Sequence, residues 1–293
     1  MLNFAGRKGG VTISSFSFLL VWISIAFTRS VTVIYLARII FGLSVGLFDV
    51  AGPIYICENV KPTYRGLFVG IVLTNFYAGL LVSFCLVNYF AYSTVAYTNC
   101  FFAFLAFSLN IILKETVAHL VSKGKYESAL KTFLWLRAKK EATVEVIGEF
   151  EVLKSFIESE NKKKRTTTDF LSVPVYRRAI LIVLVLSLLT AAHGAPAISS
   201  FVSIAFTEGV LTPNEYTILF GIFQLSSVVL GSTIIERVNR RTILIISLLT
   251  ATFMHGTTAT LFYLQQKEVY IPYFSWWIFV TITVYAMMYA SSL

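Results

Sequence analysis

The sequence is poor in charged residues. Only 13% of its 293 residues are Asp, Glu, Lys or Arg, whereas a typical soluble domain has about a quarter. Hydrophobic residues make up 57% of the chain, so the few charges cannot solvate the whole surface. This shortage excludes an ordinary soluble domain and predicts a protein whose exterior faces lipid.

Several chemical signatures are also missing. There is no Walker-type glycine loop, which excludes ATP-driven chemistry of that class. His119 and His255 are isolated, and no His, Cys and Asp residues have metal-ligand spacing. No nucleophile and base stand in a recognisable pattern, so we expect no enzyme, no metal and no cofactor. The three cysteines lie in or beside apolar runs without disulfide spacing, and are interpreted as small apolar residues: Cys57, Cys85 and Cys100.

Long apolar runs are abundant. A helix needs roughly 20 apolar residues to cross the hydrocarbon core of a bilayer. Eight stretches qualify and predict an all-α polytopic membrane protein: 11–27, 31–57, 67–92, 94–113, 179–206, 216–235, 242–264 and 269–293.

Basic residues gather in alternate connections between these runs. The net charge of +9 therefore encodes topology and does not predict a nucleic-acid partner. Because positive charge stays on the cytoplasmic side, the N-terminus, the long central loop and the C-terminus are predicted to be cytoplasmic. The predicted organisation is a four-helix part (1–113), a cytoplasmic linker (114–178) and a second four-helix part (179–293). The basic residues are Arg7, Lys8, Lys61, Arg65, the lysines and arginines of 114–178, Arg237, Arg240 and Arg241.

The linker has two amphipathic stretches, 123–137 and 144–157. Their apolar residues recur at helical spacing, which predicts short helices lying under the membrane bundle. The run 161–168 is interpreted as a solvated link, with an anionic-lipid or phosphorylation site as the alternative. The residues of the predicted apolar faces are Tyr126, Leu130, Phe133, Leu134, Leu136, Ile147, Phe150, Leu153 and Ile157.

An ordered set of short motifs runs along the chain. The motifs are Gly6-Arg7-Lys8, Arg38 with Gly42, Pro53 with Tyr55 and Glu58, Arg65-Gly66, the linker stretch 123–137, and a second basic turn from Glu236 to Arg241. Together these motifs resemble the sugar-porter branch of the major facilitator superfamily, most closely its insect trehalose-carrying members.

The resemblance implies a major facilitator type helical bundle. By its register the eight runs are helices three to ten of twelve, so the sequence is expected to be an incomplete copy of the fold. The implied function is alternating-access transport of a small polar solute, a sugar such as trehalose or a hexose. The implied carrier is a monomer in the plasma membrane, with solute and lipid as its partners.

The sequence departs from the family where sugar is bound. Leu73 replaces a glutamine of helix five, and the amide-rich motif of helix seven keeps only Gly194. A Pro-Glu-Ser-Pro motif has become Lys114-Glu115-Thr116-Val117. With fewer side-chain amides, fewer groups are present to hydrogen-bond the hydroxyls of a sugar. The alternatives are therefore a transport-inactive sensor or scaffold, or a non-functional partial gene product.

Charges at the cytoplasmic helix ends are the first candidate site. The resemblance implies that they pair to close a cytoplasmic gate and separate when it opens. The alternative is that they only fix topology, and both interpretations are compatible. These gate charges are Arg7, Glu58, Arg65, Glu236, Arg240 and Arg241.

Two charges lie inside an apolar run. A charge there costs about 3 kcal/mol or more unless it is paired or faces a cavity. Arg38 and Asp49 are eleven residues apart, close to three turns, so they share a face but are about 16 Å apart and cannot pair. Arg38 is expected to pair with another helix. Asp49 is either a proton- or cation-linked cavity group or a carboxylate neutralised by hydrogen bonds. His193 and Gly194, at an expected kink, are the other candidate cavity residues.

Overall fold

The structure is a computed structural model that describes residues 2–60, 64–138, 143–162, 173–192, 194–206, 211–234 and 240–292. Regular structure within these residues is entirely helical, which confirms the predicted all-α class. Six helices are long and apolar enough to cross a membrane. They are α1 (Leu2–Phe27), α2 (Val31–Asn59), α3 (Arg65–Tyr89), α4 (Tyr92–Ile112), α11 (Pro213–Ile234) and α12 (Arg240–Gln266).

The other two predicted runs take different forms. The last run becomes α13 (Phe274–Ser292), whose apolar part is shorter. The fifth run is divided into α9 (Pro174–Ala192) and α10 (Ala195–Ala205). Gly194 stands between them with φ 78° and ψ 8°, a left-handed conformation that glycine adopts without steric cost. The structure thus confirms the expected kink beside Gly194.

Contacts divide the chain into two compact units. The first contains Met1–Val69 and Ala91–Phe170, and the second contains Gly70–Phe90 and Leu171–Leu293. Most of α3 therefore packs with the C-terminal helices, although it precedes α4 in sequence. The predicted division at residues 113 and 178 follows chain order instead and stays a prediction.

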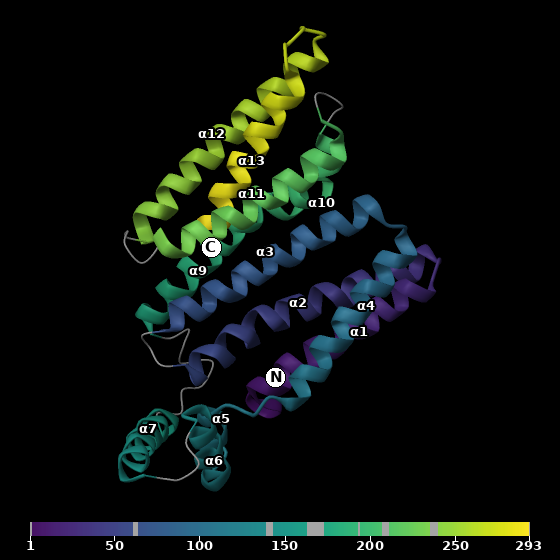
Figure 1. Ribbon diagram of the computed structural model, residues 1–293. Coiled ribbons are helices and arrows are strands. Elements are labelled where there is room, and N and C mark those ends of the chain that lie inside the picture. Colours follow the sequence, from purple (N-terminus) through teal and green to yellow (C-terminus); the bar gives the residue numbers. More distant parts are fainter. Residues whose placement is uncertain are drawn as a thin grey trace. The chain divides into compact units, whose positions relative to one another are not determined.

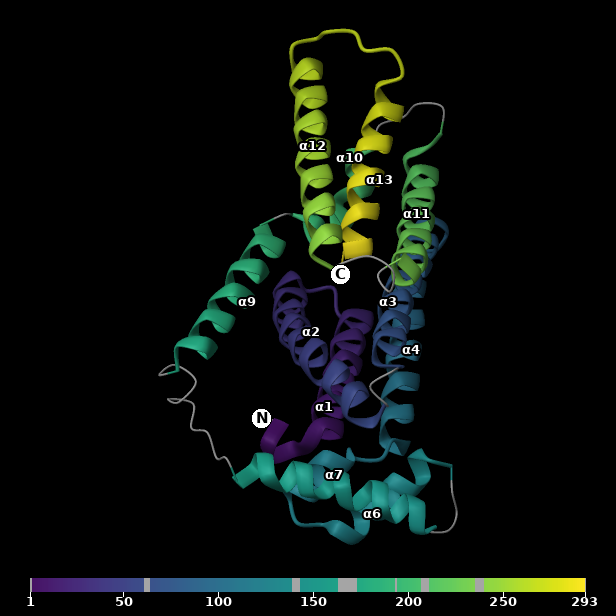
Figure 2. The same cartoon turned by 90° about the vertical axis from the view of Figure 1, so that its left-hand side faces the viewer.

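In the first unit, α1 packs against both α2 and α4 (Figures 1 and 2). Small residues on α2 face this contact: Ala37, Ser44 and Ala51 are buried at seven-residue intervals. Small side chains on one stripe allow the close approach by which membrane helices associate. Many other apolar side chains of α2 are exposed, as with Leu43 at 74%, which fits a surface that meets lipid.

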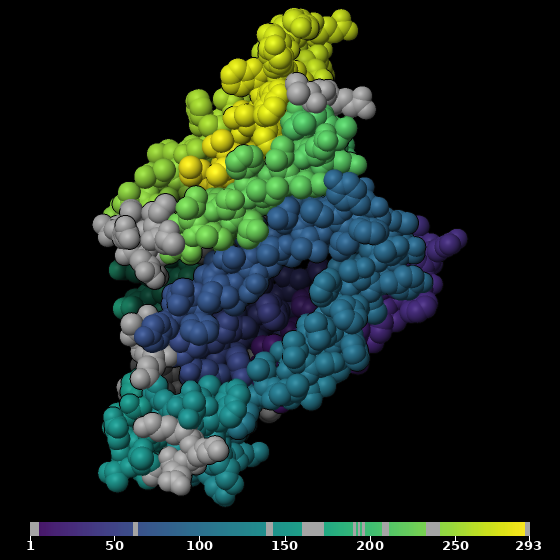
Figure 3. Space-filling model, in the orientation of Figure 1, coloured from purple at the N-terminus to yellow at the C-terminus, as the bar shows by residue number. Residues whose placement is uncertain are grey.

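Three shorter helices follow α4 in the same unit. They are α5 (Val117–Ser122), α6 (Tyr126–Leu136) and α7 (Val144–Lys162), and they appear as a teal lobe in Figure 3. α6 and α7 confirm the two predicted amphipathic helices, whereas α5 was not predicted. α5 contacts both companions and also α1 and α2, so it joins the lobe to the membrane helices.

The core of this lobe differs in detail from the predicted apolar faces. Phe133 and Phe150 are buried as predicted, with ring centroids 5.7 Å apart. The predicted Leu130, Leu134, Leu136, Leu153 and Ile157 pack partly buried around them. Tyr126 and Ile147, predicted on the same apolar faces, are 43% and 41% exposed and do not belong to this core. Ala129 and Val146 are buried instead.

The second unit has an aromatic core. α13 packs against α11 and α12, and Tyr216, Phe220 and Phe279 are buried between them and α10. Phe84 of α3 joins this core, 6.2 Å from the ring of Phe220. Gly221 permits that approach, because a Cβ at this position would lie 2.9 Å from Phe84 Cδ2.

Hydroxyl groups on the apolar helices mostly bond within their own helix. Ser24, Thr74 and Thr250 each donate to the carbonyl four residues earlier, at 2.8–2.9 Å. Such local bonds satisfy the hydroxyl without a partner on another helix. A few hydroxyls bond between helices, as in Ser227 Oγ to the Met287 carbonyl at 2.6 Å.

Candidate functional site

Five side chains converge where α1, α2 and α5 meet. Arg7 comes from α1, Glu58 from the end of α2, Glu115 and Thr116 from the segment before α5, and His119 from α5 itself. We call this set the Arg7 cluster. At its centre Arg7 Nε donates to Glu58 Oε1 at 2.9 Å, and the two side chains are only 22% and 20% exposed.

Glu115 caps a helix. α1 has non-helical torsions at Gly6 (φ 81°, ψ 174°), so the regular helix starts anew after it and its first amides lack partners within the helix. The Glu115 Oε1 atom accepts the backbone N–H groups of Arg7 at 3.1 Å and Lys8 at 3.0 Å. A carboxylate at this end of a helix is also favoured by the helix dipole.

Gly6 makes room for that carboxylate. Its φ lies in the left-handed region, which favours glycine. A Cβ at this position would collide with the carboxylate of Glu115, at 2.7 Å from Cδ, and would lie 3.2 Å from His119 Nε2. Two features therefore favour glycine at position 6: the positive φ and the lack of space for a Cβ beside Glu115.

Thr116 completes the hydrogen bonding of Glu58. The Thr116 side chain is fully buried, and its hydroxyl donates to Glu58 Oε2 at 2.6 Å. The same Oγ1 accepts the backbone N–H of His119 at 3.3 Å as the N-cap of α5. Both carboxylate oxygens of Glu58 are thus hydrogen-bonded, Oε1 to Arg7 of α1 and Oε2 to the N-cap residue of α5.

His119 touches the guanidinium from a second direction. Its Nδ1 lies 3.2 Å from Arg7 Nη1, and 8% of the residue is exposed. Because a guanidinium only donates, Nδ1 must accept, and the imidazole in this arrangement is neutral. Burial lowers the pKa of His119, and the Arg7 and Lys123 charges lower it further against the opposing effect of Glu115 and Glu58.

The predicted gate charges are only partly brought together. Arg7 and Glu58 pair, as expected for a gate. Arg65 and Arg241 are exposed and form no ion pair with another described residue. Glu236 lies outside the described residues, and for Arg240 only the helical backbone is described. The ion pair is observed, but the gate role of all six residues stays a prediction.

Sequence reasoning missed Glu115, Thr116 and His119. One signal was available, because Glu115 is the residue that survives from the Pro-Glu-Ser-Pro motif. It was interpreted as part of a lost motif, although the retained carboxylate is the group that forms the contacts. For His119 no local signal existed, since its partner Arg7 is 112 residues away.

The predicted intramembrane charges have no partner in the described part of the chain. Arg38 and Asp49 are both exposed, and neither forms an ion pair there. Their proposed structural and coupling roles stay predictions. Of the other predicted cavity residues, Gly194 forms the break before α10, and His193 lies outside the described residues.

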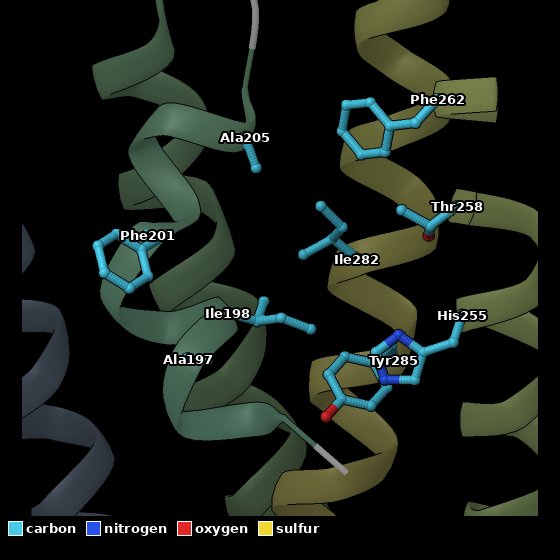
Figure 4. A pocket seen from close by; sticks show the side chains of 9 residues that line it. All are labelled: Ala197, Ile198, Phe201, Ala205, His255, Thr258, Phe262, Ile282 and Tyr285. Carbon is cyan, nitrogen blue, oxygen red and sulfur yellow. The ribbon is translucent and has the colours of Figure 1, made fainter. Parts of the chain in front are cut away.

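A pocket of about 310 Å³ lies between α10, α12 and α13 (Figure 4). Ile198 and Ile282 point toward each other across it, with Phe262 at one end and His255 and Tyr285 at the other. The rings of His255 and Tyr285 are 4.1 Å apart. Apolar walls offer few hydrogen bonds to a hydroxyl-rich solute, so this pocket by itself does not fit a sugar.

Gln224 on α11 is a buried amide with an unused acceptor. Only 3% of the residue is exposed, and its Oε1 has no hydrogen-bond partner among the described residues. A buried polar atom without a partner is uncommon and unfavourable, so it marks a candidate ligand contact. Sequence reasoning did not single out this residue. Among the described residues, no group of three or more His, Cys, Asp or Glu side chains could hold a metal.

Comparisons with known proteins agree with one another. The family model "Sugar (and other) transporter" matches residues 1–293. The facilitated trehalose transporter Tret1 of Polypedilum vanderplanki is 25% identical over 294 residues, 99% of this chain and 58% of that protein. Its counterpart in Apis mellifera ligustica is 27% identical over 273 residues, 90% of this chain and 53% of that protein. The chain thus spans about half the length of these curated relatives.

Among solved structures, the xylose transporter XylE of E. coli has a similar fold. In its partially occluded inward open conformation it matches with a TM-score of 0.79 at 20% identity. The match covers 99% of this chain and 68% of XylE. The major facilitator type of helical bundle expected from the sequence is thereby confirmed.

Proposed function

The chain belongs to the sugar (and other) transporter family and is an integral membrane protein, and we propose that it carries a small sugar across the membrane by alternating access. The Arg7 cluster is the single observation that carries this proposal. It joins two membrane helices to α5 through charged hydrogen bonds. The relatives named above as trehalose transporters suggest trehalose or a hexose as the solute.

The cluster serves as the gate. Its bonds tie α1 and α2 to α5 while they exist, and separation of Arg7 from Glu58 lets those helices part. An exposed ion pair contributes only about 0–1 kcal/mol, but this pair is mostly buried and supported by Thr116, Glu115 and His119. Because two conformations of a protein differ by only a few kcal/mol, such a set of bonds is enough to bias the equilibrium.

Gln224 supplies the hydrogen bonding that the lost amides of helix seven do not. Its carbonyl oxygen accepts a sugar hydroxyl in this proposal, which relieves the cost of burying it without a partner. The cavity roles predicted for Asp49, His193 and Gly194 stay predictions. We further propose that α5–α7 face the cytoplasm and that the membrane is the plasma membrane, in agreement with the distribution of basic residues.

Uptake of radiolabelled trehalose and glucose by cells expressing the protein tests this function. We expect saturable uptake, and we expect Gln224→Leu to lower kcat/KM about tenfold, the effect of one lost hydrogen bond to the solute. Thermal stability should not fall, because the variant removes an unsatisfied polar atom. Ser226→Ala is the matched control, since its hydroxyl bonds only to the Ile222 carbonyl of the same helix. Absence of saturable uptake of either sugar would overturn the proposal.

A further inference from the structure

His119 belongs to none of the motifs that indicated the family. It lies in the first turn of α5, held there by the Thr116 cap. α5 in turn contacts α1 and α2. A titratable ring is thereby fixed against the central guanidinium of the gate, at 3.2 Å from Arg7 Nη1.

The charges around the ring are balanced without it. Arg7 faces it from α1, Glu58 from α2 and Glu115 from the segment before α5, and Lys123 lies at the C-terminal end of α5. Two cations and two carboxylates cancel. A proton on His119 adds an uncompensated positive charge within hydrogen-bonding distance of Arg7.

We propose that His119 is a positioning residue that holds Arg7 on Glu58 while its imidazole is neutral and releases it when protonated, so that the gate loosens at acidic pH. This inference rests on the gate role proposed above. The neutral ring accepts from Nη1 while Nε donates to Glu58, so the two acceptors fix the guanidinium plane. The protonated ring has no acceptor, and two cations would then face each other.

The direction of the pH effect follows from the buried site. Burial lowers the pKa of His119 in the formed cluster, so the formed cluster binds protons less readily than the opened one. Its stabilisation is complete above about pH 6.5, the ordinary pKa of an imidazole. It is lost as the pH falls through the lowered pKa. Acid on the side of the membrane where α5 lies therefore favours opening.

Hydrogen–deuterium exchange of the full chain in nanodiscs tests the inference. The backbone amides of residues 117–122 report whether α5 is held in the cluster. After correction for the intrinsic effect of pH on exchange, we expect roughly tenfold faster exchange at pH 5.5 than at pH 7.5, the effect of one lost charge-assisted hydrogen bond.

Two variants separate positioning from packing. His119→Asn places an amide oxygen on Cγ, where Nδ1 stands in histidine, so it keeps an acceptor that does not titrate. We expect slow exchange at both pH values. His119→Leu keeps an apolar ring-sized volume without an acceptor, and we expect fast exchange at both. The inference would be overturned if the exchange rate had the same pH dependence in the wild type and in His119→Asn. It would also be overturned if exchange in the wild type did not depend on pH. That second result is expected if protonated His119 turns to Glu115 instead.

The exchange measurement does not depend on transport. Saturable uptake without the pH-dependent exchange would remove the role of His119 and leave the carrier proposal intact. If exchange depends on pH but neither sugar is taken up, the carrier proposal is overturned and the Arg7 cluster is still pH-sensitive.

Discussion

Arg7 and Glu58 form an ion pair of 2.9 Å between α1 and α2, although 51 residues separate them in sequence. The pair is sheltered from solvent, and every side-chain oxygen of Glu58 is hydrogen-bonded. It lies at the ends of two apolar helices that otherwise meet through small and apolar side chains. Loss of the pair should therefore affect both the stability of the first unit and its opening.

Glu58→Gln tests the pair directly. Glutamine keeps the shape and one acceptor but leaves the Arg7 charge without its counter-ion, which we expect to cost about 2 kcal/mol. Thermal unfolding in detergent, followed by tryptophan fluorescence, measures the loss. Arg65→Gln is the matched control and should change stability by less than about 0.5 kcal/mol, because Arg65 is exposed. Equal effects of the two variants would contradict the pairing.

Gly6→Ala tests the helix restart. The added Cβ meets the Glu115 carboxylate and also requires a left-handed φ of an alanine, so we expect a loss of about 2–3 kcal/mol. Gly148→Ala on α7 is the control, since nothing lies within 4 Å of its Cβ position. It should be neutral or stabilising by up to about 1 kcal/mol. Unfolding curves of both variants measure the change in the free energy of unfolding. An unchanged stability of the Gly6→Ala protein would show that the turn tolerates a side chain.

Phe133→Ala should unfold the α5–α7 lobe locally. The Phe133 ring is buried against Phe150, and removal of such a ring costs about 3–5 kcal/mol. Exchange of the α6 and α7 amides should rise strongly while that of α1 and α2 changes little. Phe156→Ala provides the comparison, because 64% of Phe156 is exposed. If the α6 and α7 amides exchange at the same rate in the two variants, the stability of the lobe does not depend on the Phe133–Phe150 core.

Cysteine labelling tests the proposed orientation. In a variant with Cys57, Cys85 and Cys100 replaced by serine, Lys125→Cys should react only with reagents on the cytoplasmic side. Tyr270→Cys, in the connection between α12 and α13, should react only from outside. Both positions are exposed. Reaction of both cysteines from the same side would be incompatible with the topology inferred from the basic residues.

The helices were predictable because lipid imposes a simple rule. Length and hydropathy alone indicate a membrane span. The break between α9 and α10 was predictable at Gly194, because glycine adopts the left-handed conformation easily. The lobe was less predictable: helical periodicity placed Tyr126 and Ile147 on the apolar face, yet packing against α5 selected the neighbouring Ala129 and Val146. α5 itself has only six residues, too few for periodicity to reveal.

The site was predictable only where a motif carried it. Arg7 and Glu58 belong to short motifs, and the structure pairs them. Glu115 and His119 act through contacts more than 100 residues away in sequence, and no local pattern encodes such a distance. Gln224 was invisible for another reason, because an amide in an apolar run is noticeable only when its burial and its missing partner are known.

The hydroxyl bonds within single helices bear on the speed of rearrangement. Ser24, Thr74 and Thr250 keep their bonds whatever the neighbouring helix does. A helix that slides or tilts against its neighbour therefore carries these polar groups along without exposing them to hydrocarbon. Each bond that crosses between helices would instead have to break on the way and add to the activation barrier. Most hydroxyls of the described helices therefore add nothing to that barrier. Under the gate role proposed above, the bonds of the Arg7 cluster are among those that must break.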